Sequence, residues 1–441
     1  MSTDEPQPPG RPSGAYDDDT MASRRSQQAS MMQTGLNDVT NRDRRGSSAL
    51  VRIYPDDDPN RFEFFYLETV LTTRAADAAT VAAFLAANHP ELPVQLFPDR
   101  PVPGVTTFDF GVRVDVTGLC DEMDAIRPGI AMPDHAVHVA PTGCCPATEP
   151  WPTTSGPVPE RTAVVDAGKD VRVVVVDSGR RPDLEAHFDW LDHDITGTEE
   201  DAISAGHYVG HGTFVCGVLR TQAPQAKIDV NALNFLAGAV VESDLAVELW
   251  NAIHEDKPAH LISMSAGTTT RKGYQPIALA VVCEQLAEAG ILLVAAAGND
   301  SSTEHFYPAY FSQDDADLGQ AANPNVVSVG ALDSVRRLAW FSNYDWPTVY
   351  ARGSEIVNAY PEGSYTYREP PLVGAPDQDF SDRLAIWDGT SFATPLVSGL
   401  IAARMTTHGE SVTAAWGALF AKASGQRGLG SGPSLFPGDA A

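Results

Sequence analysis

Apolar runs and helically spaced apolar residues alternate along the central and C-terminal parts of the chain. The run Val171–Val176 is almost wholly apolar, which predicts a strand buried on both faces of a sheet. In Ser243–Glu255 the apolar residues recur on one helical face, and Pro276–Ala289 is typical of a second helix that ends at Gly290. This alternation predicts a parallel, doubly wound α/β domain over residues 163–425. Further strands are predicted at Ile228–Leu233, His260–Ser265, Ile291–Ala297 and Asn325–Ala331, and a further helix at Thr390–Met405.

A different pattern precedes this domain, over residues 49–141. Its predicted elements follow the order β-α-β-β-α-β, which is the split ferredoxin-like arrangement. We therefore predict a small α+β N-terminal domain in front of the larger one. Its strands are predicted at Phe62–Arg74, Val94–Phe97, Thr106–Val116 and Ala136–Ala140, and its helices at Ala75–Asn88 and Leu119–Arg127.

Three segments lack both patterns. The first 48 residues are rich in Ser, Pro, Gln, Asp and Arg and have few large apolar side chains, which predicts a disordered tail. Residues 142–162 contain five prolines together with Gly and Ser, which predicts a linker. Residues 426–441 are predicted to form a flexible C-terminal tail.

Composition narrows the expected partners and compartment. The 441 residues include 58 acids and 30 bases, a net charge of −28, which disfavours nucleic acid and anionic membranes as partners. No apolar run reaches the ~18–20 residues of a membrane span, and no secretory signal is evident, so we expect a cytoplasmic protein. The five cysteines show neither a disulfide framework nor metal-ligand spacing, since Cys144 and Cys145 are adjacent. Cys216 and Cys283 are interpreted as small core residues on helices.

Three residues carry the candidate chemistry. Asp177 ends an apolar run and precedes Ser-Gly, His211 opens His-Gly-Thr-Phe-Val-Cys-Gly, and Ser391 lies in Asp-Gly-Thr-Ser-Phe-Ala-Thr-Pro. Taken singly, each has an ordinary structural explanation as a turn residue or a helix cap. Together they supply what a hydroxyl nucleophile needs, which is a base to take its proton and a carboxylate to orient that base. In this order and in these contexts they predict peptide hydrolysis.

Four segments resemble the signature segments of the subtilisin-like serine proteases, or subtilases: Val173–Gly179, His211–Gly217, Ala295–Asn299 and Gly389–Pro395. The resemblance covers residues 163–423 and implies an Asp-His-Ser triad, with the side-chain amide of Asn299 donating to the oxyanion. Two positions depart from the family pattern. Phe214 stands where a second His is usual in the His motif, and Leu396 where a His usually follows the proline of the serine motif. Neither is a triad position.

The resemblance also implies a substrate cleft. One wall of the primary specificity pocket would be an edge strand that pairs with the substrate backbone, and a second segment would form the opposite wall. These walls are Ser265, Ala266 and Gly267 on one side, and Ala295, Ala296, Ala297 and Gly298 on the other. The pocket floor corresponds to Phe306, whose ring would exclude large aromatic side chains, so small or medium apolar residues are expected to be preferred. Read without the resemblance, each segment is an ordinary strand end or turn.

The predicted chemistry needs no cofactor. Asp314, Asp315 and Asp317 fall in one predicted loop and could ligate structural calcium, which members of the family often bind. No EF-hand-like ligand spacing is present, so a solvated loop is the favoured interpretation. No metal site is assigned, and structural calcium stays an open alternative.

The sequence therefore predicts a serine endopeptidase that acts on peptides or proteins through an acyl-enzyme. The N-terminal domain resembles subtilase pro-domains, so we expect it to inhibit the protease until the linker is cut, with a new N-terminus within residues 142–166. The alternative is a regulated effector whose N-terminal domain is a permanent module for a regulatory protein partner. A catalytically dead binding protein is disfavoured by the complete triad.

Overall fold

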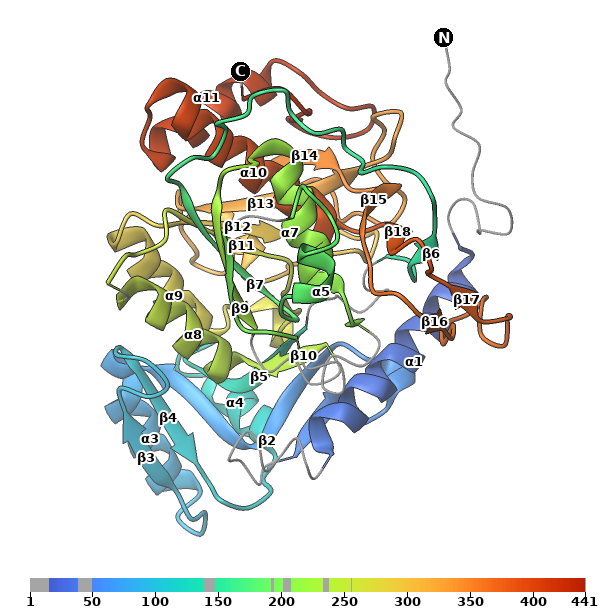
Figure 1. The fold of residues 1–441 in the computed structure, drawn as a ribbon. Coiled ribbons are helices and arrows are strands. Elements are labelled where there is room, and N and C mark those ends of the chain that lie inside the picture. Colours follow the sequence, from blue (N-terminus) through green and yellow to red (C-terminus); the bar gives the residue numbers. More distant parts are fainter. Residues whose placement is uncertain are drawn as a thin grey trace.

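The structure is a computed structural model, and it describes residues 16–38, 50–138, 147–191, 194–200, 208–232, 238–254 and 256–440. Figure 1 shows a large α/β unit and, below it and drawn in blue, a smaller α+β unit. The large unit contains the sheet and helices predicted for residues 163–425, and the small unit contains those predicted for residues 49–141.

A seven-stranded sheet forms the centre of the large unit. Its strands are all parallel and lie in the order β14-β13-β12-β11-β7-β9-β8, so the chain winds in opposite directions from β7. This is the doubly wound arrangement, and it confirms the predicted fold class. The strands are β7 (Arg172–Asp177), β8 (Ile195–Gly197), β9 (Lys227–Ala232), β11 (Leu261–Met264), β12 (Leu292–Ala296), β13 (Val326–Leu332) and β14 (Val349–Arg352).

Helices cover both faces of this sheet. In β7, Val173 and Val175 belong to the same hydrophobic core as α7 and α10, whereas Val174 and Val176 belong to the core of α8 and α9. Because neither face meets water, the middle of β7 is apolar at every position from Val173 to Val176. Cys216 on α7 and Cys283 on α9 are buried, as predicted. The helices are α5 (Pro182–Glu185), α7 (His211–Gln222), α8 (Glu242–His254), α9 (Ile277–Glu288), α10 (Thr390–His408) and α11 (Val412–Ser424).

The small unit contains elements in the predicted order β-α-β-β-α-β, from β2 to β5, preceded by an additional strand, β1, that was not predicted. Its antiparallel sheet has the order β5-β2-β4-β3, with β1 paired to β2, and the strand β10 (Ala239–Val241) of the large unit extends it beside β5. Helices α3 and α4 cover one face, while Leu67 and Val70 on the other face join the core of α8 and α9. The elements are β1 (Val51–Tyr54), β2 (Phe64–Arg74), α3 (Ala78–Asn88), β3 (Gln95–Pro98), β4 (Val105–Asp109), α4 (Val116–Met123) and β5 (Ala131–His138).

Some boundaries in the small unit differ from the predicted ones. Strand β4 ends at Asp109, whose Oδ1 accepts a hydrogen bond from the backbone N–H of Gly111, a residue with a φ of +64°. Helix α4 then begins early, at Val116, because the Asp115 side chain caps it by accepting from the N–H of Gly118. These local hydrogen bonds set the boundaries, and apolar periodicity does not reveal them.

The prediction that the first 48 residues are disordered is wrong for much of that segment. Residues 18–37 form the helix α1 (Asp18–Asn37), capped by Asp17, whose side chain accepts from the N–H of Thr20. Residues 1–15 and 39–49 lie outside the described residues. Three of the apolar side chains of α1 lie at helical spacing and are buried, which an average over composition hides: Ala29, Met32 and Leu36.

The predicted linker and C-terminal tail are also packed against the large unit where they are described. Trp151 of β6 (Trp151–Pro152) pairs with Ile386 of β18, while residues 142–146, with Cys144 and Cys145, lie outside the described residues. In the tail, Leu435 is fully buried and its N–H donates to the carbonyl of Tyr350. The prolines and glycines of these two segments therefore do not prevent the segments from packing against the large unit. The remaining strands are β15 (Ile356–Ala359), β16 (Ser364–Tyr365), β17 (Gln378–Asp379) and β18 (Leu384–Trp387).

Candidate active site

The fold brings the three candidate catalytic residues to one edge of the sheet. Asp177 is the last residue of β7, His211 is the first residue of α7, and Ser391 is the second residue of α10. All three side chains are buried. The carboxyl ends of parallel strands and the N-termini of the following helices meet at this edge, so residues far apart in sequence become neighbours.

Asp177 and His211 form a direct hydrogen bond. Asp177 Oδ1 lies 2.7 Å from His211 Nδ1, and the same oxygen accepts from the backbone N–H of Ser178. The His211 ring also packs against the rings of Trp387 and Phe392, each with its centroid 5.5 Å away. The aspartate and the aromatic side chains therefore fix the orientation of the imidazole and turn Nε2 away from the carboxylate.

Ser391 is held by its backbone. Its carbonyl accepts a hydrogen bond of 2.9 Å from the hydroxyl of Ser265. Within the described part of the chain, Ser391 Oγ and His211 Nε2 are both buried and neither has a hydrogen-bond partner. Buried polar atoms normally have a hydrogen-bond partner in a protein interior. In a catalytic pair, the hydrogen bond between base and nucleophile often forms only when substrate is bound.

Asn299 lies next to Ser391. Its Oδ1 accepts from both the backbone N–H and the hydroxyl of Thr390, each at 2.8 Å. The preceding residue, Gly298, has a φ of +106°, and a Cβ there would lie 2.6 Å from the Asn343 side chain. This close turn and the two hydrogen bonds fix the carboxamide with its oxygen toward α10 and its NH₂ group directed away from Thr390.

The end of β5 lies in the predicted substrate cleft. The N–H of His138 donates to the carbonyl of Gly267, and the N–H of Gly267 donates back, at 3.0 and 2.9 Å. On its other side the same strand pairs with β10, where Ala239 is opposite His138. The N-terminal domain thus places its last described residues as the middle strand between the two edges of the cleft.

Phe306 fills the space between the two predicted walls of the specificity pocket. A Cβ on Gly267 would lie 2.2 Å from the Phe306 ring, and one on Gly298 would lie 3.4 Å from it. The ring is fully buried, 6.1 Å from the ring of His138. Ala295 instead has its side chain in the core of α8 and α9, so it does not face the space that Phe306 fills. The other three alanines of the predicted walls are also buried: Ala266, Ala296 and Ala297.

Helix α1 binds the segments around Ala147 and Glu369. The buried guanidinium of Arg24 lies 2.5 Å from the carboxylate of Glu369 and donates to the carbonyl of Ala147, and Gln28 also donates to Glu369. Figure 1 shows α1 running from the small unit toward β16 and β17. Sequence reasoning missed this element; its only signal was the helical spacing of its three buried apolar residues.

The residues that follow Ala147 reach the catalytic motif itself. The Thr148 hydroxyl donates to Asp388, and the carbonyl of Thr148 accepts from the indole N–H of Trp387 at 2.6 Å. Trp387 is the residue that packs on His211. His138 and Ala147 therefore lie on either side of the catalytic centre.

Two of the three aspartates considered for calcium stabilise their own loop through their side chains. Asp314 accepts from the N–H of Ala322, and Asp315 accepts from the N–H groups of Asp317 and Leu318. Across the described ranges, no three His, Cys, Asp or Glu side chains gather in a way that could hold a metal ion. These residues do not fit a calcium site, and the chemistry below uses none.

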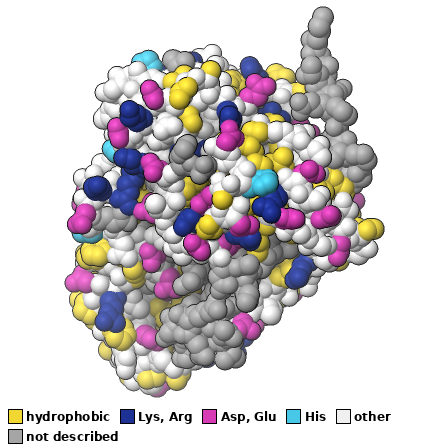
Figure 2. Space-filling view, viewed as in Figure 1, with side chains coloured by type: hydrophobic (Ala, Val, Ile, Leu, Met, Phe, Trp, Pro, Cys, Tyr) yellow, Lys and Arg dark blue, Asp and Glu magenta, His cyan; other side chains and the backbone are white. Residues whose placement is uncertain are grey.

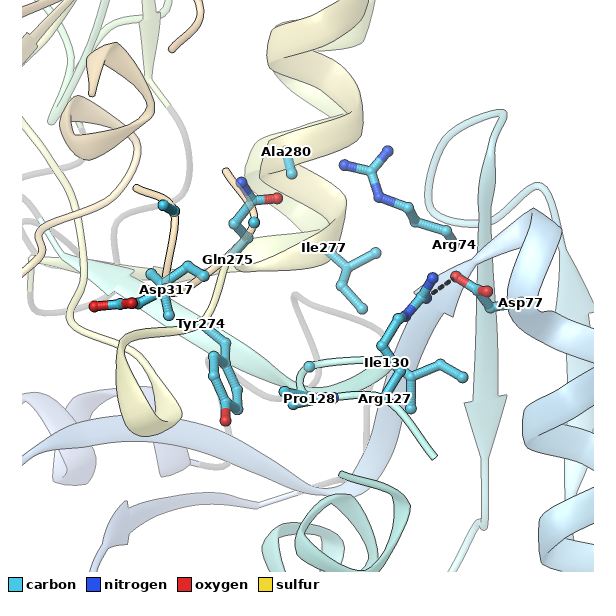
Figure 3. A pocket seen from close by; sticks show the side chains of 14 residues that line it. Arg74, Asp77, Arg127, Pro128, Ile130, Tyr274, Gln275, Ile277, Ala280 and Asp317 are labelled. Carbon is cyan, nitrogen blue, oxygen red and sulfur yellow. Dashed lines mark hydrogen bonds and ion pairs between the residues drawn. The ribbon is translucent and has the colours of Figure 1, made fainter. Parts of the chain in front are cut away.

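The most prominent cavity lies elsewhere, along the seam between the two units (Figure 3). It measures about 490 Å³ and is lined by Arg74, Asp77 and Arg127 of the small unit and by Tyr274 of the large one. Both arginines are ion-paired, Arg74 with Glu284 at 2.7 Å and Arg127 with Asp77. None of the candidate catalytic residues lines it, so it belongs to the contact between the two units.

Figure 2 shows acidic and basic side chains interspersed over the face in view. In the part of the chain that the structure describes, no helix is both long enough and apolar enough to span a membrane.

Comparison with known proteins places this site in a family. The chain belongs to the subtilase family, whose model matches residues 168–418, more than half of the chain. It is 30% identical over 272 residues to a thermophilic serine proteinase of Bacillus sp. strain AK1, covering 57% of this chain and 53% of that protein. Thermitase of Thermoactinomyces vulgaris is 27% identical over 268 residues, covering 56% of this chain and 78% of the relative. For the first of these, the matched part is only about half of the relative's length.

A solved structure shows the same fold. Fervidolysin from Fervidobacterium pennivorans, a keratinolytic enzyme related to subtilisin, superposes with a TM-score of 0.55 at 18% sequence identity. The match covers 85% of this chain and 61% of that one, so it extends beyond the residues matched by the family model.

Proposed function

We propose that the chain is a serine endopeptidase with Asp177, His211 and Ser391 as its triad. One observation carries the proposal: a buried imidazole is hydrogen-bonded to a buried carboxylate, and an unpartnered serine hydroxyl lies at the start of α10. Membership of the subtilase family supports the same roles.

The geometry supports acyl transfer by the following steps. His211 Nε2 takes the proton of Ser391 Oγ as this oxygen attacks the scissile carbonyl, and Asp177 stabilises the imidazolium that forms. The Asn299 amide and the backbone N–H groups at the start of α10 donate to the oxyanion. His211 then protonates the leaving amine, and water hydrolyses the acyl-enzyme with His211 again as base.

The decisive test is a Ser391→Ala variant. Its kcat should fall by about 10⁶, the magnitude known for loss of the serine from a subtilisin triad. A covalent serine-hydrolase probe should label the wild type at Ser391 and leave the variant unlabelled. Ser424→Ala, which changes a serine at the surface of α11, is the matched control and should keep full activity. Peptide cleavage by Ser391→Ala near the wild-type rate would overturn the proposal.

We also propose that the N-terminal domain inhibits the protease until the chain is cut. The pairing of His138 with Gly267 and β10 puts the end of this domain where an extended substrate would bind, in the manner of strand addition. Buried polar contacts anchor it: His135 Nδ1 lies 3.2 Å from Glu242, and Asp134 accepts from the N–H of Ser243. Burial and the neighbouring Glu242 raise the pKa of Asp134 well above its ordinary value.

The first cut is proposed to fall between His138 and Ala147, because these residues lie on either side of the catalytic centre. Wild type and Ser391→Ala should be followed together on a gel over time, with N-terminal sequencing of the product. Wild type should become shorter and Ser391→Ala should stay whole. Full activity in uncut wild type would instead favour the regulated effector, in which the N-terminal domain is a permanent module for a protein partner.

A further inference from the structure

We propose that Glu200 is a positioning residue that ties the aspartate and histidine motifs together; the proposal rests on the function proposed above. Sequence reasoning gave Glu200 no role, since in Thr198-Glu199-Glu200 it is typical of a solvated acidic surface. The structure buries its side chain completely, beside the catalytic pair.

The contacts of Glu200 reach the residues that flank both catalytic side chains. Its Oε1 accepts from the hydroxyl of Ser178 and from the backbone N–H of Gly210, each at 2.8 Å. The Ser178 oxygen in turn accepts from the N–H of Gly212 at 3.1 Å. Ser178 follows Asp177 directly, and Gly210 and Gly212 enclose His211, so one carboxylate fixes the backbone on both sides of the 2.7 Å bond.

The backbone of Glu200 lies close against the backbone that follows Asp177. A Cβ at Gly179 would lie 2.7 Å from the Glu200 Cα, so only glycine permits the approach of the two segments. Gly210, whose N–H donates to Glu200, has a φ of +85°, which presents that N–H at the start of α7. A contact with Glu200, which lies outside both motifs, thus explains Gly179 and the glycine that precedes His211.

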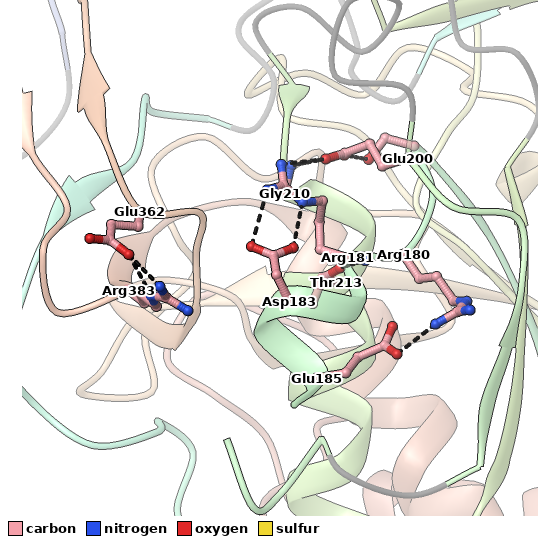
Figure 4. Close-up of polar contacts among 10 residues, drawn as sticks. Arg180, Arg181, Asp183, Glu185, Glu200, Gly210, Thr213, Glu362 and Arg383 are labelled. Atoms are coloured by element: carbon pink, nitrogen blue, oxygen red, sulfur yellow. Dashed lines mark hydrogen bonds and ion pairs between the residues drawn. The ribbon is translucent and has the colours of Figure 1, made fainter. Parts of the chain in front are cut away.

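Charge makes the contact sensitive to pH. The charged and titratable groups that face Glu200 are Asp177, Arg181 and Tyr360. Arg181 is 3.7 Å away and is hydrogen-bonded to Asp183, as Figure 4 shows, so it compensates Glu200 only partly. Burial raises the pKa of Glu200 to about 7, and its charge therefore changes near neutral pH.

The ionised form is the one that supports catalysis. A carboxylate accepts the hydrogen bonds from Ser178 and Gly210 more strongly than a neutral carboxyl does. Its negative charge near the catalytic pair also favours the imidazolium that forms during the reaction. Because ionisation sets in as the pH rises through about 7, activity should gain from Glu200 above that pH and lose this gain below it.

The test is Glu200→Gln, which keeps the size of the side chain and removes its charge. We expect kcat per active site to fall by about 10–100-fold with little change in KM, the range for hydrogen bonds to a charged group. The variant should also lose the ionisation near pH 7 from its pH–kcat profile. Glu199→Gln is the matched control, since the side chain of that neighbour is 67% exposed and lies 3.4 Å from Arg180.

A second measurement tests the role of Glu200 without relying on peptidase activity. In the full-length Ser391→Ala chain, the downfield proton NMR signal of the His211–Asp177 hydrogen bond should shift between pH 6 and 8, and adding Glu200→Gln should abolish that shift. An unchanged NMR response together with a wild-type kcat profile would overturn the role of Glu200. Peptidase activity in Ser391→Ala would overturn the proposed function, while the NMR signal would still decide about Glu200.

Discussion

The proposed catalytic centre and the proposed substrate cleft depend on different kinds of contact. In the centre, single side chains carry the contacts, as in the 2.7 Å bond between Asp177 and His211. In the cleft, backbone carries them, as in the paired N–H and carbonyl groups of His138 and Gly267. The difference teaches where this molecule should be sensitive to substitution. In the centre, substitution of one side chain should be enough to abolish activity. In the cleft, most substitutions that keep the strand extended should be tolerated.

The largest remaining effect in the centre is expected at Asn299. Its carboxamide is fixed by two 2.8 Å bonds to Thr390, so its NH₂ group is preorganised for the oxyanion. Asn299→Ala should lower kcat by about 10²–10³ with KM nearly unchanged, because the hydrogen bond strengthens only in the transition state. Steady-state kinetics test this, with the exposed Asn251→Ala on α8 as control. If the substitution raised KM and left kcat unchanged, Asn299 would act in substrate binding. The contrast between the centre and the cleft would then be wrong.

Phe306 tests the one place where a side chain shapes the cleft. The ring lies between Gly267 and Gly298, so removing it should open the pocket for large aromatic side chains. Phe306→Gly should raise the kcat/KM ratio of a Phe substrate to an Ala substrate by about 10–100-fold, which corresponds to roughly 1–3 kcal/mol.

The ratio of two substrates is used because it does not depend on how much of the variant folds. Phe306→Leu should give an intermediate ratio, since leucine leaves part of the space filled. If both variants keep the wild-type ratio, Phe306 is not the pocket floor and the cleft is defined by backbone alone.

The effect expected at His138 depends on pH and is small near neutral pH. Its ring is buried among Phe62, Phe65 and Phe306, and burial lowers its pKa to about 3. The docked strand therefore favours neutral imidazole, while the undocked strand can take up a proton. Docking is fully stable above about pH 6.5 and weakens by up to about tenfold per pH unit as the pH falls toward 3.

Hydrogen exchange at the His138 amide, in the uncut Ser391→Ala chain, measures this docking without any cleavage. Protection, corrected for the intrinsic exchange rate, should drop between pH 7 and pH 5. His138→Phe should remove the drop, and His89→Phe, which changes a partly buried histidine on the same domain, should leave it. A drop that persists in His138→Phe would show that another group controls docking.

The sequence information for the proposed centre is local. Asp177, His211 and Ser391 each lie in a short motif at the junction of a strand and a helix, and the apolar strands identify those junctions. The doubly wound sheet was predicted from the same strands. A strand that is covered on both faces is an apolar run, and such a run can be recognised without knowing which distant segments pack against it.

Contacts between distant segments were not predictable in this way. Helix α1 is mostly polar, and only its packing against the two units stabilises it, so composition predicted disorder. Glu200 belongs to no motif, and its burial depends on Ser178 and Gly210 meeting it in space. The pairing of β10 with β5 joins residues about a hundred positions apart, which periodicity along the chain does not detect.

Helix α1 also bears on the order in which the precursor would come apart. It shares a hydrophobic core with the small unit, while Arg24 and Gln28 bind Glu369 on the far side of the catalytic centre. The N-terminal region is therefore a bivalent ligand of the large unit, and each attachment holds the other nearby. A cut between His138 and Ala147 leaves both attachments in place, so release should lag behind cleavage. A second cut, between Asp38 and Leu50, would separate the two attachments and turn slow release into fast release.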